Sequence, residues 1–189
     1  MSGCINICSI GFVDKDILRH ISECIETRYG FICKVSPGME NPRYAYDETR
    51  DQYNSKLILK HLLQSCTHDT LRLIGITQLD LYVPILKYVF GLALMEGQCA
   101  VISLHRLYPR FYDQPLDHDL LMNRVEKTVF HELGHSFGLI HCRDRRCVMY
   151  PSTRIEDTDL KQPDFCLTCF ELFQWYIKKM PKQYTFEDG

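Results

Sequence analysis

The most informative segment of the sequence is His131-Glu132-Leu133-Gly134-His135-Ser136-Phe137-Gly138-Leu139-Ile140-His141. Two histidines four residues apart on a helix lie on one face, one turn apart, so both imidazoles can reach a single metal ion. Gly138 lets the chain leave the helix through a left-handed or otherwise strained turn, which brings His141 back as a third nitrogen ligand. Three neutral histidines leave a fourth position for water, the pattern of a catalytic zinc site.

Glu132 follows the first ligand and is placed to contact the metal's water rather than the metal. We expect it to act as general base while zinc lowers the pKa of that water toward about 7, and then to pass the proton to the leaving amine. The stretch therefore predicts a zinc-dependent peptidase that works through a metal-activated water. The remaining histidines lack this spacing and are predicted to be ordinary surface or core residues: His20, His61, His68, His105 and His118.

A long helix is predicted around this stretch, from Asp117 to Gly138, with Asp117 or Asp119 as its N-cap. Its apolar side chains cluster within roughly 120° of one another. His131 and His135 lie on the opposite side of the helix, so one side should face a core and the other a cleft. The apolar positions are Met122, Val125, Val129, Leu133 and Phe137.

Four cysteines lie in the segment that follows His141: Cys142, Cys147, Cys166 and Cys169. Two close pairs match a closed tetrahedral thiolate site, which zinc fills as a structural ion. Two disulfides or a redox pair are the alternative interpretations. Because Cys142 directly follows His141, the second site would clamp the loop that delivers the third histidine. The sequence thus predicts two zinc ions per chain, one catalytic and one structural.

Length, charge and hydropathy limit the number of domains, the partners and the location that the chain can have. A chain of 189 residues suits one domain, and a formal net charge of -2 gives no reason to expect a nucleic-acid partner. No run approaches the roughly 18 apolar residues of a membrane span, and the N-terminal Met1-Ser2-Gly3-Cys4 does not resemble a secretory signal. We expect a cytoplasmic monomer with reduced thiols, and expect the other cysteines to be small buried hydrophobes: Cys4, Cys8, Cys24, Cys33, Cys66 and Cys99.

Upstream of the long helix, apolar runs alternate with amphipathic stretches, which predicts an α/β (α+β) fold with a mixed sheet and helices packed against it. Strands are predicted over Ile5–Val13, Phe31–Val35 and Leu71–Thr77, helices over Lys15–Arg28, about Asp51–Ser65 and about Asp164–Lys179, and a loop over Asn41–Gln52. Tyr88–Ala93 and Ala100–His105 are predicted to form a hairpin. We expect Ala100–His105 to be an exposed sheet edge against which an extended peptide pairs.

The histidine motif followed by a Met-containing turn, here Met149 in Cys147-Val148-Met149-Tyr150-Pro151, is the signature of metzincin metalloproteases. With the four cysteines, residues 131–169 closely resemble the archaemetzincins, and Thr77–His105 resembles them more loosely. The resemblance implies a compact metzincin-like single domain over residues 1–189 with a twisted sheet and an antiparallel edge strand. Residues 1–138 would carry the sheet and the active-site helix. Residues 139–189 would carry the third histidine, the cysteine site, the Met-turn and the C-terminal helix.

The resemblance also implies roles for single residues. Catalytic zinc would bind His131, His135 and His141, with Glu132 as base, and structural zinc would bind the four cysteines. Met149 would form an apolar floor beneath the histidines, and Tyr150 is a candidate oxyanion donor.

Two other classes of protein compete with the peptidase. One is a non-catalytic zinc-binding domain for peptide interaction or regulation, against which Glu132 argues, because such a site needs no carboxylate that does not bind the metal. The other is a redox-responsive protein whose cysteines release zinc on oxidation. The substrate would be a peptide or protein. Aminopeptidase action would require an anchor for a free amine, with Glu96, Asp113 and Asp117 as candidates.

Overall fold

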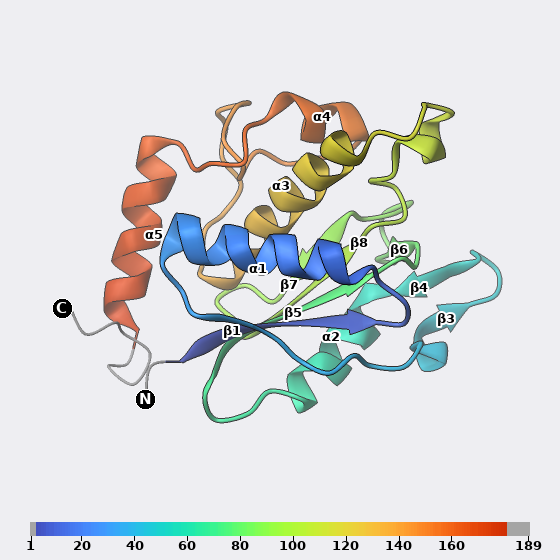
Figure 1. Cartoon of the computed structure of the whole chain (residues 1–189), viewed down its shortest axis with the longest axis horizontal. Coiled ribbons are helices and arrows are strands. Elements are labelled where there is room, and N and C mark those ends of the chain that lie inside the picture. Colours follow the sequence, from blue (N-terminus) through green and yellow to red (C-terminus); the bar gives the residue numbers. More distant parts are fainter. Residues whose placement is uncertain (1–2, 181–189) are drawn as a thin grey trace.

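The computed structural model describes residues 3–180 (Figure 1). Met1 and Ser2, the first residues of the N-terminal sequence discussed above, lie outside the described residues. Residues 181–189 of the predicted domain also lie outside them. No helix between residues 3 and 180 is long and apolar enough to cross a bilayer.

A five-stranded sheet with the strand order β2-β1-β5-β8-β7 forms the centre of the fold. Its members are β1 (Cys4–Ile10), β2 (Cys33–Val35), β5 (Thr70–Thr77), β7 (Gly91–Ala93) and β8 (Cys99–Ser103). The first four strands in this order run parallel, and β7 pairs antiparallel with β8. The predicted mixed sheet with an antiparallel edge strand is confirmed.

The prediction that Ala100–His105 forms the exposed edge is wrong. β8 covers most of that segment and lies between β5 and β7, with all of its residues buried. The run Cys-Ala-Val-Ile-Ser lacks the alternation of a strand with one wet face, as expected where helices cover both faces of the sheet. The predicted hairpin itself is confirmed by the pairing of Leu92 with Val101, and its first strand, β7, has the free edge.

Helices cover both faces of the sheet (Figure 1). α1 (Lys15–Tyr29) and α3 (His118–Ser136) pack on one face, and α2 (Ser55–Gln64) packs on the other. Alternate strand residues point to opposite sides, as a period of two requires. The α1 and α3 side includes Ile7, Ile74 and Ile102, whereas the α2 side includes Cys8, Leu73 and Val101.

Local signals explain where the first two helices begin and end. Asp14 caps α1 by accepting a hydrogen bond from the Asp16 backbone, and Gly30 ends it in the left-handed region at φ 69°. α2 begins at Ser55 rather than near Asp51, because Gln52–Asn54 forms strand β4 and the Asn54 side chain caps the helix.

The predicted loop at Asn41–Gln52 is therefore only partly a loop. It contains the 3₁₀ helix η1 (Arg43–Ala45) and strand β3 (Tyr46–Asp47), which pairs with β4. With β6 (Leu81–Tyr82) these strands form a second, three-stranded sheet.

The chain after β8 builds the layer that surrounds α3. The 3₁₀ helix η2 (Pro109–Tyr112) leads into α3, and two further helices follow, α4 (Ile155–Leu160) and α5 (Leu167–Lys179). α5 was predicted, although it begins after Cys166 rather than at Asp164. α4 was not predicted, because one and a half turns leave too short an apolar pattern to recognise.

Candidate metal centres

α3 is held in place at its start and along its length. Asp117 caps it, with its side chain accepting from the Leu120 backbone N–H at 2.9 Å, as predicted. Nearly every side of the helix is covered, and the buried Arg124 forms a bidentate pair with Asp159, with N···O distances of 2.7 Å. The remaining side faces a cavity, which it lines with Thr128, His131, Glu132 and His135.

The turn after α3 brings the three histidines of the motif together. Gly138 has φ 108°, a conformation that side chains rarely adopt, and a Cβ there would also lie 2.8 Å from the Tyr176 ring. One ring nitrogen from each of His131, His135 and His141 lies within 4.8 Å of those of the others. The predicted return of His141 is confirmed as a geometric fact.

Backbone carbonyls determine which nitrogens of the first two histidines are free. His131 Nδ1 lies 2.8 Å from the Val148 carbonyl, and His135 Nδ1 lies 2.7 Å from the Leu139 carbonyl. A carbonyl only accepts hydrogen bonds, so each Nδ1 carries the proton and each Nε2 presents a lone pair. The two Nε2 atoms are 3.1 Å apart. Two lone pairs this close repel each other unless a cation lies between them, and tetrahedral zinc would place two such nitrogens about 3.3 Å apart.

Burial keeps these imidazoles neutral, which is the form that binds a metal. It lowers the pKa of His131 well below its ordinary value, lowers that of His135 to about 4, and also lowers that of His141. The nearby Lys161 ammonium acts in the same direction on all three.

Glu132 lies beside the histidines in the same cavity and is only 6% exposed. Burial raises its pKa to about 8, and the Lys161 ammonium opposes this shift. β7 leaves just enough space for the carboxyl group, since a Cβ on Gly91 would lie 2.9 Å from Glu132 Oε1. A buried carboxylate with a raised proton affinity is suited to accept a proton from a water in the cavity.

Met149, the candidate for the apolar floor, packs against the histidine helix. It is fully buried, and its Sδ would overlap a Cβ on Gly134, which lies between the two helical histidines in the sequence. The expected oxyanion role of Tyr150 is not supported, because Tyr150 is absent from the cavity lining. Its backbone carbonyl instead accepts a hydrogen bond from Lys161 Nζ at 2.9 Å.

The cavity has a volume of about 680 Å³ and two walls. One wall is the free edge of β7 with the residues before it, and the other is the segment Pro151–Thr153 together with α4. The Tyr88 hydroxyl joins them by donating to the Thr153 carbonyl at 2.9 Å. Among residues 3–180, Glu132 is the only carboxylate that lines the cavity. The candidate amine anchors Glu96, Asp113 and Asp117 do not line it.

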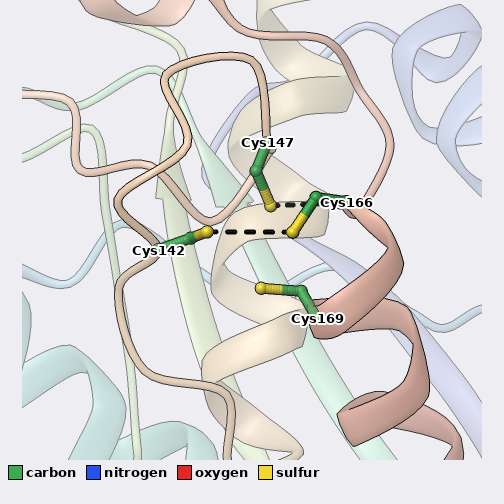
Figure 2. Close-up of side chains that lie close together, drawn as sticks. All are labelled: Cys142, Cys147, Cys166 and Cys169. Carbon is green, nitrogen blue, oxygen red and sulfur yellow. Dashed lines mark hydrogen bonds between the residues drawn. The ribbon is translucent and has the colours of Figure 1, made fainter.

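The four cysteines converge on one point (Figure 2). Cys142 and Cys147 come from the loop after α3, and Cys166 and Cys169 come from the start of α5. Their sulfurs lie within 4.8 Å of one another. Cys142 and Cys166 have an Sγ···Sγ distance of 3.8 Å, far longer than a disulfide bond, whereas tetrahedral zinc would space its sulfurs at about 3.8 Å.

Backbone groups support this cluster as thiolates. The Asp144 N–H donates to Cys142 Sγ at 3.4 Å, and the Cys166 N–H donates to Cys147 Sγ at 3.3 Å. Burial raises the pKa of Cys147 to about 11. Burial thus favours the neutral thiol at Cys147, and four thiolates at this spacing would repel one another without a cation. The donor set fits zinc.

A third group of metal-ligating side chains was not expected from the sequence. His20 and Cys24 on α1 lie close to Glu126 on α3. The Glu126 carboxylate is already paired with the Arg28 guanidinium at 2.5 Å. We therefore assign no metal to this group.

Two residues of the histidine centre could not be identified from the sequence. Gly91 gives no signal beyond being a glycine in a strand, and Lys161 is one lysine among many in the chain. Both reach the site from distant elements, so only the folded chain reveals them.

Comparisons with known proteins agree with the geometry. Residues 21–175 match the model of Peptidase family M54. The archaemetzincin of Methanocaldococcus jannaschii is 41% identical over 165 residues, covering 87% of this chain and 89% of that protein. The archaemetzincin of Pyrococcus furiosus is 38% identical over 177 residues, covering 89% and 91% of the two chains.

Solved structures of archaemetzincins have the same fold as this chain. The archaemetzincin of Methanopyrus kandleri superposes with a TM-score of 0.80 at 35% identity, covering 93% of this chain and 97% of that one. The archaemetzincin of Archaeoglobus fulgidus, complexed with malonate, gives 0.77 at 29% identity, covering 88% and 98%. With its mixed α/β fold and its converging histidines, this chain belongs to Peptidase family M54, the archaemetzincins, and is a zinc metallopeptidase.

Proposed function

We propose that the chain hydrolyses peptide bonds at the three-histidine centre, with His131, His135 and His141 holding a catalytic zinc and Glu132 acting as general base. Cys142, Cys147, Cys166 and Cys169 would hold a second, structural zinc. The proposal rests mainly on the short distance of 3.1 Å between His131 Nε2 and His135 Nε2, next to the buried carboxyl group of Glu132.

Zinc supplies Lewis-acid chemistry when bound, because it acidifies water and polarises a carbonyl. The protein supplies the proton path and the orientation. Glu132 accepts the proton of the attacking water at a carboxylate oxygen and returns it to the amine nitrogen that leaves. The Val148 and Leu139 carbonyls hold the two helical imidazoles in the required tautomer.

An extended peptide substrate would lie along β7. This strand has a free edge and lines the cavity with Gly91, Leu92 and Ala93, so its backbone can pair with a substrate strand. Aminopeptidase action is not favoured, because no second carboxylate among residues 3–180 lines the cavity to hold a free amine.

Gly91→Ala tests the position of Glu132. The new methyl group would lie 2.7 Å from Glu132 Cγ and must displace it. We expect kcat/KM to fall by roughly 10- to 100-fold, since a displacement of about 1 Å at a reacting group has effects of this size. Zinc content should be unchanged, and shortening the carboxylate in the Gly91→Ala/Glu132→Asp double variant should recover part of the loss. A Gly91→Ala enzyme with full activity would show that the Glu132 carboxylate is not the reacting base.

A peptide-library digest followed by mass spectrometry, with zinc content measured on the same sample, tests the function itself. We expect cleavage that stops when the metal is removed and returns when zinc is added. A protein that carries two zinc ions and cleaves no peptide would instead be the non-catalytic binding domain considered above.

A further inference from the structure

Lys161 follows the last residue of α4, lines the cavity and is only 2% exposed. Its Nζ donates to the Tyr150 carbonyl at 2.9 Å and lies 3.4 Å from His131 Nδ1. That Nδ1 carries the proton given to the Val148 carbonyl, so it cannot accept a second one. An ammonium group has three donors, and Lys161 therefore has one acceptor for them.

No carboxylate neutralises this ammonium at close range. Among residues 3–180, Lys161 forms no ion pair with an aspartate or glutamate. The shielded cations Arg124 and Arg106 do have such partners, Asp159 and Asp80. Lys127, which is also shielded, donates to the Asp159 backbone carbonyl at 3.2 Å and does not line the cavity. Glu132 interacts with the ammonium electrostatically but does not form an ion pair with it. A buried ammonium without a directly paired anion is costly, and Lys161 differs from Lys127 in that it lines the cavity.

Two hydroxyl groups that belong to residues of the same cavity lining also lack partners. Thr158 Oγ1 and Ser152 Oγ are buried and make no hydrogen bond within the described part of the chain. Thr158, Ser152 and Lys161 all line the same cavity, on the wall opposite β7. One ammonium and two hydroxyls offer more donors than the single Tyr150 carbonyl accepts. A carboxylate supplies two further acceptor oxygens and the opposite charge.

We propose that the part of the cavity lined by Lys161, Thr158 and Ser152 is a carboxylate subsite. There Lys161, assisted by the two hydroxyl groups, binds a carboxylate of the substrate beside the scissile bond. The proposal rests on the proposed function, because it assigns the cavity to a peptide cleaved at the adjoining centre. The carboxylate has two sources: an aspartate or glutamate side chain next to the cleaved bond, or the free C-terminus of the peptide.

Binding of two matched ligands tests the subsite without any turnover. Succinic acid monohydroxamate and the hydroxamate of succinic acid monoamide share a metal-binding end and differ only in a terminal carboxylate or carboxamide. With zinc-loaded wild-type protein, calorimetry should show the acid binding about 10- to 100-fold more tightly than the amide, as a charged hydrogen-bond pair provides. Equal affinities in the wild type would overturn the proposal.

Variants assign the preference to Lys161. In Lys161→Met the ratio of the two affinities should fall to near one, and in Lys161→Arg most of it should remain. Lys127→Met is the matched control, because Lys127 is also buried and yet does not line the cavity, so the ratio should persist. An unchanged ratio in Lys161→Met would refute the assignment. Should that variant fail to fold, Thr158→Val decides, with a several-fold smaller ratio expected and an unchanged ratio counting against the subsite.

Peptide cleavage separates the two sources and separates the subsite from the proposed function. Substrates with an internal glutamate or glutamine, each with an amidated or free C-terminus, are compared by kcat/KM. A preference for glutamate in amidated peptides identifies a side chain, and cleavage near a free C-terminus alone identifies the terminal carboxylate. Cleavage with no charge preference refutes the subsite and leaves the peptidase. Ligand discrimination without any cleavage supports the subsite and refutes the peptidase.

Discussion

Glu132→Gln should abolish measurable peptide hydrolysis while the protein keeps its zinc. The amide has the volume of the carboxyl group but cannot accept the proton of the attacking water, and a general base contributes about 10²- to 10⁴-fold to such rates. The histidines and their backbone partners are untouched, so metal content by elemental analysis should equal that of the wild type. Initial rates on the best substrate from the library digest measure the effect.

Thermal stability provides the control for this variant. Burial raises the pKa of Glu132 to about 8, so the folded chain favours the neutral carboxyl group, and ionising that group costs stability above its ordinary pKa. This cost applies to the metal-free chain, in which a neutral glutamine removes it. The melting temperature of the metal-free variant at pH 8 should therefore be at least that of the metal-free wild type. Hydrolysis at the wild-type rate would refute the proposed mechanism.

Cys166→Ser should reduce the zinc content from two ions per chain to one and destabilise the fold strongly. Loss of a structural metal belongs to the few changes that cost more than about 4 kcal/mol, and each kcal/mol corresponds to roughly 2–4 °C in a domain of this size. We therefore expect the melting temperature to fall by about 10–20 °C. Elemental analysis and calorimetry on the same sample measure both effects.

Cys24→Ser is the matched control for the cysteine site. Cys24 is a half-buried thiol on α1, outside the four-cysteine group, and its metal-ligating neighbour Glu126 is already paired with Arg28. Both zinc ions and most of the stability should remain in this control. If Cys166→Ser also kept two zinc ions and an unchanged melting temperature, the structural-zinc proposal would be wrong.

The spacing of a few residues was enough to predict the histidine centre. His131 and His135 share a helix face by local geometry, and Gly138 allows the chain to turn so that His141 comes back toward them. The convergence of all three histidines could therefore be predicted from the sequence. The Asp117 cap and the Gly30 helix end were predictable for the same reason, since each depends only on neighbours a few residues away.

The walls of the cavity could not be predicted, because they depend on contacts between distant segments. Lys161 reaches His131 across 30 residues, and Gly91 meets Glu132 only because β7 is the outer strand of the sheet. Strand order is not encoded in the periodicity of a strand, so the edge was assigned to Ala100–His105 instead. Tyr150 was chosen for its hydroxyl group, whereas it is its backbone carbonyl that contacts Lys161.

Three consecutive residues after α3 connect the two metal centres. Cys147 belongs to the four-cysteine group, the Val148 carbonyl orients His131, and Met149 packs under Gly134. An ion on the four cysteines would therefore also fix the Val148 carbonyl against His131. In the proposed enzyme, removal of that ion should disturb the histidine centre even though none of the histidines binds it.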